Sequence, residues 1–492
     1  MKSLPLPLQR LVATAFFGLA GLMMTASTAS AQSLDLWRVL PGERGIPVMP
    51  GDATPVGATC VDNDTAAALA APLALADAIR IALCSNPRAR QAWFDAAAQA
   101  ATVGLSKAAY LPTVNASISK SYDAVRTPGS FNNQRSGNQV HGANLTLSWL
   151  LLDSGGRAAN VRQAEQNLAA AMAGHGGLLQ SLFVGTAQAY YEAAAASASV
   201  RAAQQAEDTA RESAQAAETK LQLGAATVVD MLQARTALSQ ATLARVRAEG
   251  QARTSLGALA HVMGIDVRSP LQLAADADLD PLASSEPPVA EDYLQQLDTL
   301  INDALAAHPT LLAARAQLAS AEARLEAVRS EGFPSLTLTH SNFRNGRPGS
   351  TLPTSLTYER ITAVTLSFPI FEGLSRNYRM HEQRAVVESR RADLEGVRSQ
   401  VAFEVWRAFE ALRVETGSVA ASADLMRSAH ESLLAAKARY QAGAAHTVDV
   451  LMAQKDEANA RQERIAALAS WRTSRLRLIA GLGRLGFWAL GA

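Results

Sequence analysis

The sequence predicts a mainly α-helical chain with a small β content, built as an internal duplication. Hydrophobic residues make up 48% of the 492 residues but aromatic residues only 5%, so alanine must account for much of the hydrophobic content. Alanine is the best helix former and lets helices approach closely. The duplication shows first in residues 220–234 (KLQLGAATVVDMLQA) and 439–453 (RYQAGAAHTVDVLMA), which share eight of fifteen positions.

The N-terminus has the pattern of a secretory signal peptide. Lys2 and Arg10 are basic, residues 11–24 are apolar, and Ala29-Ser30-Ala31 fits the small-x-small cleavage rule. We expect residues 1–31 to be the signal peptide, with cleavage between Ala31 and Gln32. The apolar run is shorter than the roughly 20 residues of a spanning helix, which disfavours a membrane anchor. No comparable apolar run follows, so a form embedded in a membrane would have to be a β-barrel.

Cys60 and Cys84 are the only cysteines of the chain. Export places them in an oxidising compartment, where we expect a disulfide to tie an N-terminal arm (residues 32–72) to the first helix. Such a bond would stabilise the fold by roughly 3 kcal/mol. The alternative is one buried thiol and one without a role.

The duplication extends over nearly the whole chain. Residues 83–87 (LCSNP) match residues 305–309 (LAAHP) at an offset of 222, and residues 147–153 (LSWLLLD) match residues 366–372 (LSFPIFE) at an offset of 219. The change of offset places an insertion or deletion in a loop between them. We therefore expect the following parts: repeat 1 at 73–264, an inter-repeat linker at 265–294, repeat 2 at 295–483, and a C-terminal tail at 484–492.

Each repeat begins and ends with a predicted helix of about 37 residues, at 73–109 and 228–264 in repeat 1. A much longer helical pattern separates them, at 156–222 and again at 375–441. About 66 residues at 1.5 Å each give a helix of roughly 100 Å, a length typical of coiled coils. The corresponding shorter helices of repeat 2 are expected at 295–331 and 447–483.

The repeated glycine phrase predicts the tip of a long helical hairpin. Gly224 and Gly443 interrupt the helical pattern, and glycine adopts the positive φ that such a turn requires. Thr227 or Thr447 is then expected to cap the returning helix.

Four segments show the alternation of strands, at about 113–127, 139–153, 335–345 and 357–372. Apolar residues alternate with Ser, Thr and Asn, and an aromatic residue (Trp149, Phe368) lies near the same end of two strands. This pattern is typical of transmembrane barrels, where aromatics form a belt at the membrane interface. The alternative is a half-buried soluble sheet. Because a small barrel needs about eight strands and open edges are not tolerated in lipid, we expect several chains to pool their strands.

The duplicated order and its motifs resemble the TolC family of outer-membrane channel-tunnels. The motifs are Asn86-Pro87 after the first helix, the strand ending at residues 147–153, and the glycine-to-aspartate spacing of the tips. The resemblance implies a homotrimer in the outer membrane of a Gram-negative bacterium, with a shared 12-stranded transmembrane β-barrel. It further implies an α-barrel of helical hairpins across the periplasm, and docking of a periplasmic adapter protein and an inner-membrane transporter at its far end.

The resemblance also implies roles for tip residues. Asp449 matches the family's acidic ring at the periplasmic aperture, and Asp230 is its equivalent in the first tip. Met452 stands where some members have a second aspartate, which puts a double ring in doubt. The alternative is that both aspartates cap the returning helices or pair with an arginine. The expected adapter contacts are Gly224, Ala225 and Ala226 with Gly443, Ala444 and Ala445.

Cys60 together with the Leu-Cys-x-Asn-Pro stretch around Cys84 resembles the subgroup that serves type I protein secretion, such as the outlet for an adenylate cyclase–haemolysin toxin. That subgroup implies an inner-membrane transporter of the ABC type. The alternatives are a drug or metal efflux channel and, from another class, a periplasmic coiled-coil structural or adapter protein.

Other chemistry has little support in the sequence. Basic and acidic residues balance at 45 and 44 with no basic stripe, so nucleic acid is a poor partner. Residues 481–486 spell G-x-G-x-x-G but follow a helix and precede no βαβ unit. The histidines and cysteines lack the spacing of a metal site, and no nucleophile–base set is present. We therefore expect no cofactor, no metal and no enzymatic activity.

Overall fold

The computed structural model describes residues 71–126, 135–274, 297–344 and 357–483. The chain divides into two units, Met1–Glu43 and Arg44–Ala492, and every described residue lies in the second. The expectations for the signal peptide, for cleavage between Ala31 and Gln32, for Cys60, and for most of the arm, linker and tail lie outside the described residues.

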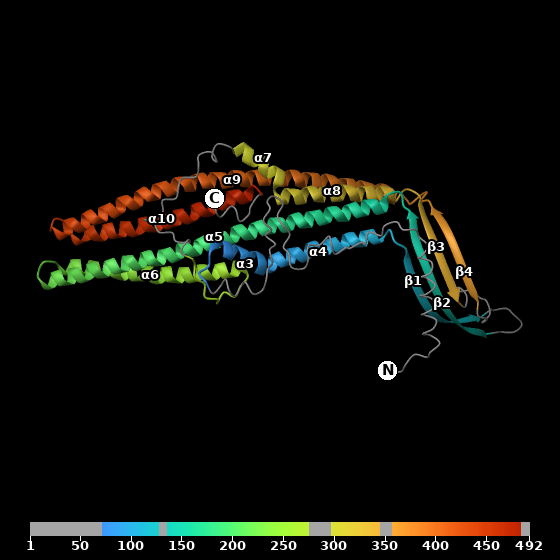
Figure 1. Ribbon diagram of the computed structural model, residues 1–492, viewed down its shortest axis with the longest axis horizontal. Helices are drawn as coiled ribbons and strands as arrows, with labels where there is room; N and C mark the ends of the chain where they lie inside the picture. Colours follow the sequence, from blue (N-terminus) through green and yellow to red (C-terminus); the bar gives the residue numbers. More distant parts are fainter. Residues whose placement is uncertain (1–70, 127–134, 275–296, 345–356, 484–492) are drawn as a thin grey trace. The chain divides into compact units, whose positions relative to one another are not determined.

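The described part is mainly helical with four strands, and the same order of elements occurs twice (Figure 1). Repeat 1 contains α3 (Leu75–Ser85), α4 (Pro87–Ala108), β1 (Thr113–Arg126), β2 (Arg135–Leu152), α5 (Gly156–Gln222) and α6 (Val228–Met263). Repeat 2 contains α7 (Leu297–Ala307), α8 (Pro309–Ser330), β3 (Ser335–Arg344), β4 (Tyr358–Ser367), α9 (Ser375–Gln441) and α10 (Thr447–Gly481).

The first helix of each repeat is broken, and the prediction of one continuous helix was wrong at this point. Asn86 separates α3 from α4 with φ −67° and ψ 124°, and His308 separates α7 from α8 with φ −63° and ψ 127°. Both residues precede a proline, whose ring disfavours the helical conformation of the residue before it. The proline itself is well placed as the first residue of the next helix.

The helices of the two repeats pack side by side (Figure 1). α5 contacts α4 and α6 of its own repeat, and it also contacts α8 and α10 of the second repeat. α9 in turn contacts α8 and α10. The order therefore leaves α9 at one edge of this helical layer and α4 with α6 at the other.

The core lies where α3 covers the middle of α5. Tyr190 of α5 is 1% exposed and donates its hydroxyl proton to the carbonyl oxygen of Leu73 at 3.0 Å. Around it the buried residues are mostly alanines, including Ala193, Ala194 and Ala198. Small side chains let neighbouring helices approach closely, so an alanine-rich interior holds the layer together with few large residues.

The four strands form one antiparallel sheet in the order β1-β2-β3-β4. The register of β2 with β3 shifts between Leu150 and Leu152, which marks a bulge. β4 ends at Ser367, earlier than the predicted strand end at 372, so that Phe368 lies just past it. Pro369 follows, and proline has no N–H to donate to a neighbouring strand.

Candidate functional site

The two hairpin tips are built by the same local geometry. Gly224 has φ +73° and Gly443 has φ +77°, the left-handed conformation that glycine adopts without strain. In the first tip the N–H of Ala225 donates to the carbonyl of Lys220 at 2.7 Å, and in the second Ala444 donates to Arg439 at 2.8 Å. These are the bonds of a Schellman motif, which satisfies the last carbonyls of a helix.

The aspartate after each turn caps the returning helix. The side chain of Asp230 accepts from the N–H of Thr227 at 3.0 Å, while the Thr227 hydroxyl accepts from the N–H of Asp230 at 3.2 Å. In the second tip, Asp449 accepts from the N–H of His446 at 2.9 Å. The capping role considered for both aspartates is therefore present in the structure.

Thr227 and Thr447 were the two residues predicted to cap the returning helices. Thr447 does not cap α10, so the prediction was wrong for this residue. The cap position is taken by His446, because the second tip carries His446 where the first carries Thr227. Thr447 is instead the first residue of α10 and is only 9% exposed. The repeated phrase did not reveal this difference, because each tip contains a threonine and the threonine of the second tip is shifted by one position.

The two tips of one chain touch each other. The Nζ of Lys220 lies 3.6 Å from the centre of the Tyr440 ring, a cation–π contact between the ends of α5 and α9. Hydrogen bonds from Thr227 hold the pKa of Asp230 below its usual range, and a weaker hydrogen bond from Thr447 of the other tip acts in the same direction. Asp230 therefore loses its proton more readily than an ordinary aspartate.

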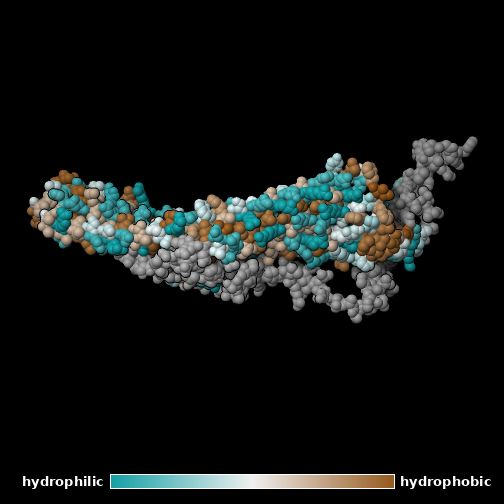
Figure 2. All heavy atoms as spheres, turned by 90° about the horizontal axis from the view of Figure 1, so that it is seen from above, coloured by the Kyte–Doolittle hydropathy of each residue, from teal (hydrophilic) through white to brown (hydrophobic). Residues whose placement is uncertain are grey.

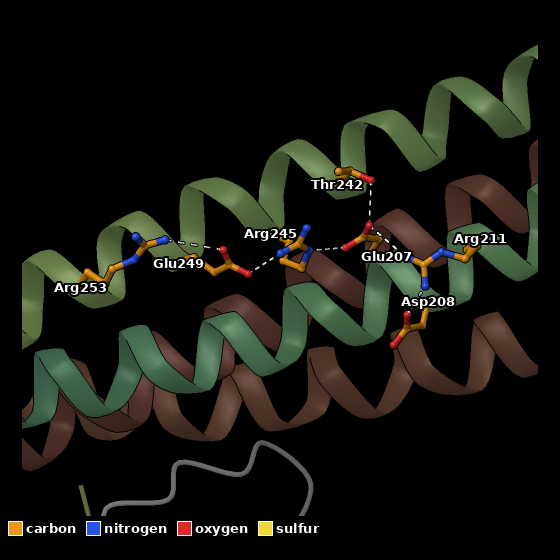
Figure 3. A network of polar contacts seen from close by, with 7 residues as sticks. All are labelled: Glu207, Asp208, Arg211, Thr242, Arg245, Glu249 and Arg253. Carbon is orange, nitrogen blue, oxygen red and sulfur yellow. Dashed lines mark hydrogen bonds and ion pairs between the residues drawn. The ribbon is translucent and has the colours of Figure 1, made fainter. Parts of the chain in front are cut away.

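The first hairpin is fastened by a network of charged residues between α5 and α6 (Figure 3). Glu207 is only 6% exposed and accepts from Arg245 at 2.5 Å and from Thr242 at 3.0 Å, both on α6. Arg211, one turn along α5, donates to the same carboxylate at 3.0 Å. Hydrogen bonding to Arg245 is the main reason why the pKa of Glu207 lies below its usual range.

The sheet has an apolar face near the helices, and large side chains on it are exposed. Val114, Ile118, Trp149, Val364 and Leu366 are each at least 39% exposed, and Ile118 reaches 87%. Figure 2 shows hydrophobic residues gathered where the strands meet the long helices. Such a surface on a monomer marks a contact with membrane or protein.

Trp149 and Phe368, the predicted aromatic belt, both lie at this junction. Trp149 is 39% exposed and its Nε1 donates to the carbonyl of Tyr110 at 2.9 Å, while Phe368 is 58% exposed. Further exposed residues lie in the adjoining segments: Phe333, Ile370, Phe371 and Tyr378. Ile370 and Phe371 fall within the predicted strand at 357–372 but lie past the observed end of β4 at Ser367. Tyr378 was not expected, because it lies in α9, where strand alternation does not identify a face.

The opposite face of the sheet carries hydroxyl groups. Thr146 of β2 and Ser341 of β3 lie opposite each other, and their hydroxyl oxygens are 3.1 Å apart. The apolar face does not extend along the whole sheet, since it includes His340, which is hydrogen bonded to Thr362 at 2.8 Å. The apolar face is therefore interrupted by polar side chains, among them His340 and Thr362.

Arg157 fastens the sheet to α5. Its guanidinium donates to the carbonyls of Leu150 at 2.6 Å and Leu151 at 3.1 Å, and lies 4.6 Å from the Tyr110 ring centre. It also pairs with Asp153 at 3.4 Å. Sequence analysis assigned no role to Arg157, so its role emerges from the structure.

The remaining predicted residue in the described part, Cys84, is disulfide-bonded, and its expected partner Cys60 lies outside the described residues. No group of three or more His, Cys, Asp or Glu within the described ranges could hold a metal ion.

A cavity of about 730 Å³ between α5, α8, α9 and α10 is lined by His308, Glu404 and Arg477 among others. Burial lowers the pKa of His308 there.

Among the described helices, α5 contains a stretch that is long and apolar enough to suit a membrane span. Its composition has another cause, because α5 packs against α4, α6, α8 and α10 along its length. An alanine-rich face is what these contacts require, so hydropathy alone does not make α5 a transmembrane helix.

Comparisons with known proteins agree with this architecture. The pattern of the family described as "Outer membrane efflux protein" matches twice, at residues 78–265 and 300–484. Protein CyaE of Bordetella pertussis is 34% identical over 414 residues, which cover 84% of this chain and 85% of that protein.

Solved structures share the fold at lower identity. The open state of the Neisseria gonorrhoeae MtrE outer membrane channel has a TM-score of 0.69 at 22% identity, over 83% of this chain and 88% of that one. The outer membrane protein VceC of Vibrio cholerae has a TM-score of 0.68 at 19% identity, over 83% and 96% of the two chains. With both repeats matched by the family pattern, this chain belongs to the outer membrane efflux protein family.

Proposed function

We propose that this outer-membrane channel works as a homotrimer that forms one passive duct across the periplasm and the outer membrane. Three chains would contribute four strands each to a closed 12-stranded barrel, and their hairpins would surround a tunnel. The duct catalyses no reaction; it acts through its geometry and its polar lining.

The observation that carries this proposal is the pair of free edges in the described part of the chain. β1 and β4 lie at the two ends of the sheet. In lipid, unpaired backbone N–H and C=O groups cost several kcal/mol each, so a four-stranded open sheet is not stable there. Twelve strands exceed the roughly eight that a barrel needs, whereas four do not.

We assign the periplasmic entrance to the hairpin tips. The small residues Gly224 to Ala226 and Gly443 to Ala445 form turns that project beyond the helices, and a periplasmic adapter protein would contact them. Opening the entrance would require the tips of one chain to separate. The contact that opposes this is the cation–π pair of Lys220 with Tyr440.

Asp449 and Asp230 would supply negative charge at this entrance. Carboxylates gathered around a narrow axis attract cations and slow their passage. Asp449→Ala is therefore expected to raise single-channel conductance in planar bilayers and to weaken block by divalent cations. Asp449→Asn keeps an oxygen that can cap α10 and removes only the charge, so it should have the same effect. Unchanged conductance and cation block in both variants would exclude Asp449 as part of the aperture.

The favoured cargo is a secreted protein, delivered by an inner-membrane transporter of the ABC type. Support comes from the 34% identity to Protein CyaE and from Cys84 within the Leu-Cys-x-Asn-Pro stretch. The second candidate is export of drugs or metal ions, which is favoured by the similarity of fold to other outer membrane channels.

Deletion of the chain tests the proposal. Culture-supernatant proteins and sensitivity to drugs and metal ions are then measured in the same strain, with the wild-type chain restored as control. Loss of a secreted protein with unchanged sensitivity supports protein export. Increased sensitivity with an unchanged set of secreted proteins contradicts it and supports efflux of small molecules.

A further inference from the structure

The cavity of about 730 Å³ lies at the joint between α8 and α10. Both of these helices contact α5 and α9, and they follow one another between the two long helices (Figure 1). α10 ends at Gly481 and α8 begins at Pro309, and the lining of the cavity comes from all four helices and from His308. Its volume falls within the range of about 300–1,000 Å³ that small-molecule sites have.

Two arginine side chains reach the cavity from different helices. Arg407 belongs to α9 and Arg477 to α10. Arg407 makes no hydrogen bond or ion pair with any residue in the described part of the chain. Arg477 donates to Oε1 of Gln188 at 2.5 Å and forms no ion pair within the described ranges. Both guanidinium groups can therefore receive an anion from outside the chain.

The remaining charges at the cavity offset these two cations only in part. Glu404 is the one carboxylate among the described lining residues, and it accepts from Nε2 of Gln400 at 2.8 Å. Burial lowers the pKa of His308, against an opposing effect of Glu404, so His308 is neutral near pH 7. The start of α8 and the end of α10 contribute helix dipoles of opposite sign, which largely cancel. The lining thus carries two positive charges against one negative charge.

Two other cavities in the described part have no such excess. In a cavity of about 440 Å³ at the base of the sheet, two arginines stand with two carboxylates. In a cavity of about 360 Å³ between α8 and α9, three arginines stand with three carboxylates. Balanced charges of this kind satisfy one another, whereas the cavity at the joint leaves one positive charge without an internal partner.

The fold does not require the charged residues of this cavity. Repeat 1 carries no charge at the positions that correspond to Glu404, Arg407 and Arg477 at the offset of 219. These positions are Gly185, Gln188 and Ala258. Repeat 1 nevertheless forms the same helices in the same order. The charged lining is therefore a property of this cavity and not of the duplicated scaffold.

We propose that the cavity binds a small molecule through a carboxylate or phosphate group, with the guanidinium groups of Arg407 and Arg477 as its charged contacts. A guanidinium presents a planar set of N–H donors that matches the oxygens of both groups. Apolar lining residues such as Val184 and Ala408 would contact the rest of the ligand. This site is separate from the export function proposed above and does not depend on it.

Neighbouring hydrogen bonds hold part of the site in place before a ligand arrives. Gln188 donates to Glu192 at 2.7 Å, which leaves its carbonyl oxygen to hold Arg477. Gln180 lines the cavity, is 7% exposed, and donates to the carbonyl of Gly483 at 2.9 Å. Groups that are already ordered lose less conformational freedom on binding.

A bound anion would join α9 to α10. The ligand would lie between guanidinium groups that belong to the two helices and would neutralise the excess positive charge at the joint. Because it binds the folded chain, it should raise the melting temperature of the helices as its concentration increases.

Calorimetric titration of the full chain in mild detergent tests the site. The probes are inorganic phosphate and succinate, each compared with sodium chloride at the same ionic strength and at about pH 7.5, where His308 is neutral. We expect saturable binding of at least one probe. Binding of phosphate alone assigns the site to phosphate groups, and binding of succinate alone assigns it to carboxylates. If neither probe binds more tightly than chloride, the proposal is wrong.

Arginine variants test which side chains hold the anion. Arg407→Gln and Arg477→Gln should each weaken binding by about tenfold or more, since a hydrogen-bonded charge partner is lost. The matched control is Arg398→Gln, which removes the same charge from α9 nine residues, or about 13 Å, away and outside the cavity lining. It should bind the probe as the wild type does.

Arg407→Gln decides the question, because Arg407 makes no contact that the fold would lose. Circular dichroism should show the same helix content as in the wild type. Unchanged affinity in this folded variant, or an equal loss of affinity in Arg398→Gln, would show that the cavity is not the binding site. Export by the cells would be unaffected by that result, so the proposed function would stand.

Discussion

The carboxylate of Glu207 accepts hydrogen bonds from both helices of the first hairpin, and it is the buried centre of the network in Figure 3. Removing it leaves Arg245 and Arg211 beside each other without their shared partner. Arg245 keeps Glu249 and Arg211 keeps Asp208, each within its own helix, so the link that Glu207 makes between α5 and α6 is lost. We therefore predict that Glu207→Ala accelerates amide hydrogen exchange in the middle of α5 and α6. Asp208→Ala is the matched control, since Asp208 is exposed and pairs with Arg211 on its own helix at 2.7 Å.

Hydrogen exchange that is equally fast in both variants would contradict this role, because Asp208 occupies the neighbouring position on α5 without reaching α6. Exchange near the tips serves as an internal reference, since it should change in neither protein.

Burial of His175 makes the stability of the helical layer depend on pH. His175 is 3% exposed and lies edge-on to Trp93 of α4, with ring centres 6.0 Å apart. Burial disfavours the charged form and lowers the pKa of His175. In the unfolded chain the histidine takes up a proton below its ordinary pKa of about 6.5, whereas in the folded chain it does so only at lower pH. Folding stability is therefore lost as pH falls through about 6.5 towards the lowered pKa.

His175→Phe should reduce this loss, because phenylalanine keeps the ring contact and takes up no proton. The difference in melting temperature between about pH 7.5 and about pH 5.5 is predicted to be smaller in the variant than in the wild type. The circular dichroism of the helices measures it. The same difference in both proteins would show that His175 is not a source of the pH dependence.

At the scale of elements, two glycines with the same backbone conformation are expected to respond differently to substitution. Gly224 has φ +73° and an added Cβ would meet nothing within 4 Å, so Gly224→Ala should cost roughly 1–2 kcal/mol of backbone strain. Gly264 has φ +75°, and its Cβ would approach the backbone of Asn86 to 2.9 Å. Gly264→Ala should therefore lower the melting temperature of the helices more than Gly224→Ala does. Equal effects would show that the approach of α6 to the helix break is not tight.

The elements themselves follow from the sequence to different degrees. The long helices α5 and α9 begin just after the repeated segments 147–153 and 366–372, and they end two residues before the repeated glycines Gly224 and Gly443. Both signals are visible in the sequence. The breaks at Asn86 and His308 were missed because a proline is also a good first helical residue, so its presence within a helical pattern does not say where a helix ends.

The tips were predictable in part. A repeated glycine followed six residues later by aspartate indicates a turn and a cap, and both are present at Gly224 and Gly443. The contact of Lys220 with Tyr440 joins residues 220 positions apart and depends on how the two hairpins pack. Local patterns carry no information on such a contact.

At the scale of the whole molecule, the chain contains two copies of one structural unit. In the described part, the sheet still has two unpaired edge strands, β1 and β4. The duplication is visible in the sequence, and the family pattern matches it twice. What lies against β1 and β4 cannot be read from a single chain, because the neighbour at each edge would be another copy.

The central claim is that several chains join to form one duct, and the mass of the intact assembly tests it most directly. The protein is extracted from outer membranes in a mild detergent, and its mass is measured by native mass spectrometry after removal of the detergent. The account predicts a mass three times that of the mature chain. A mass equal to a single chain, from protein that still exports its cargo in cells, would contradict it.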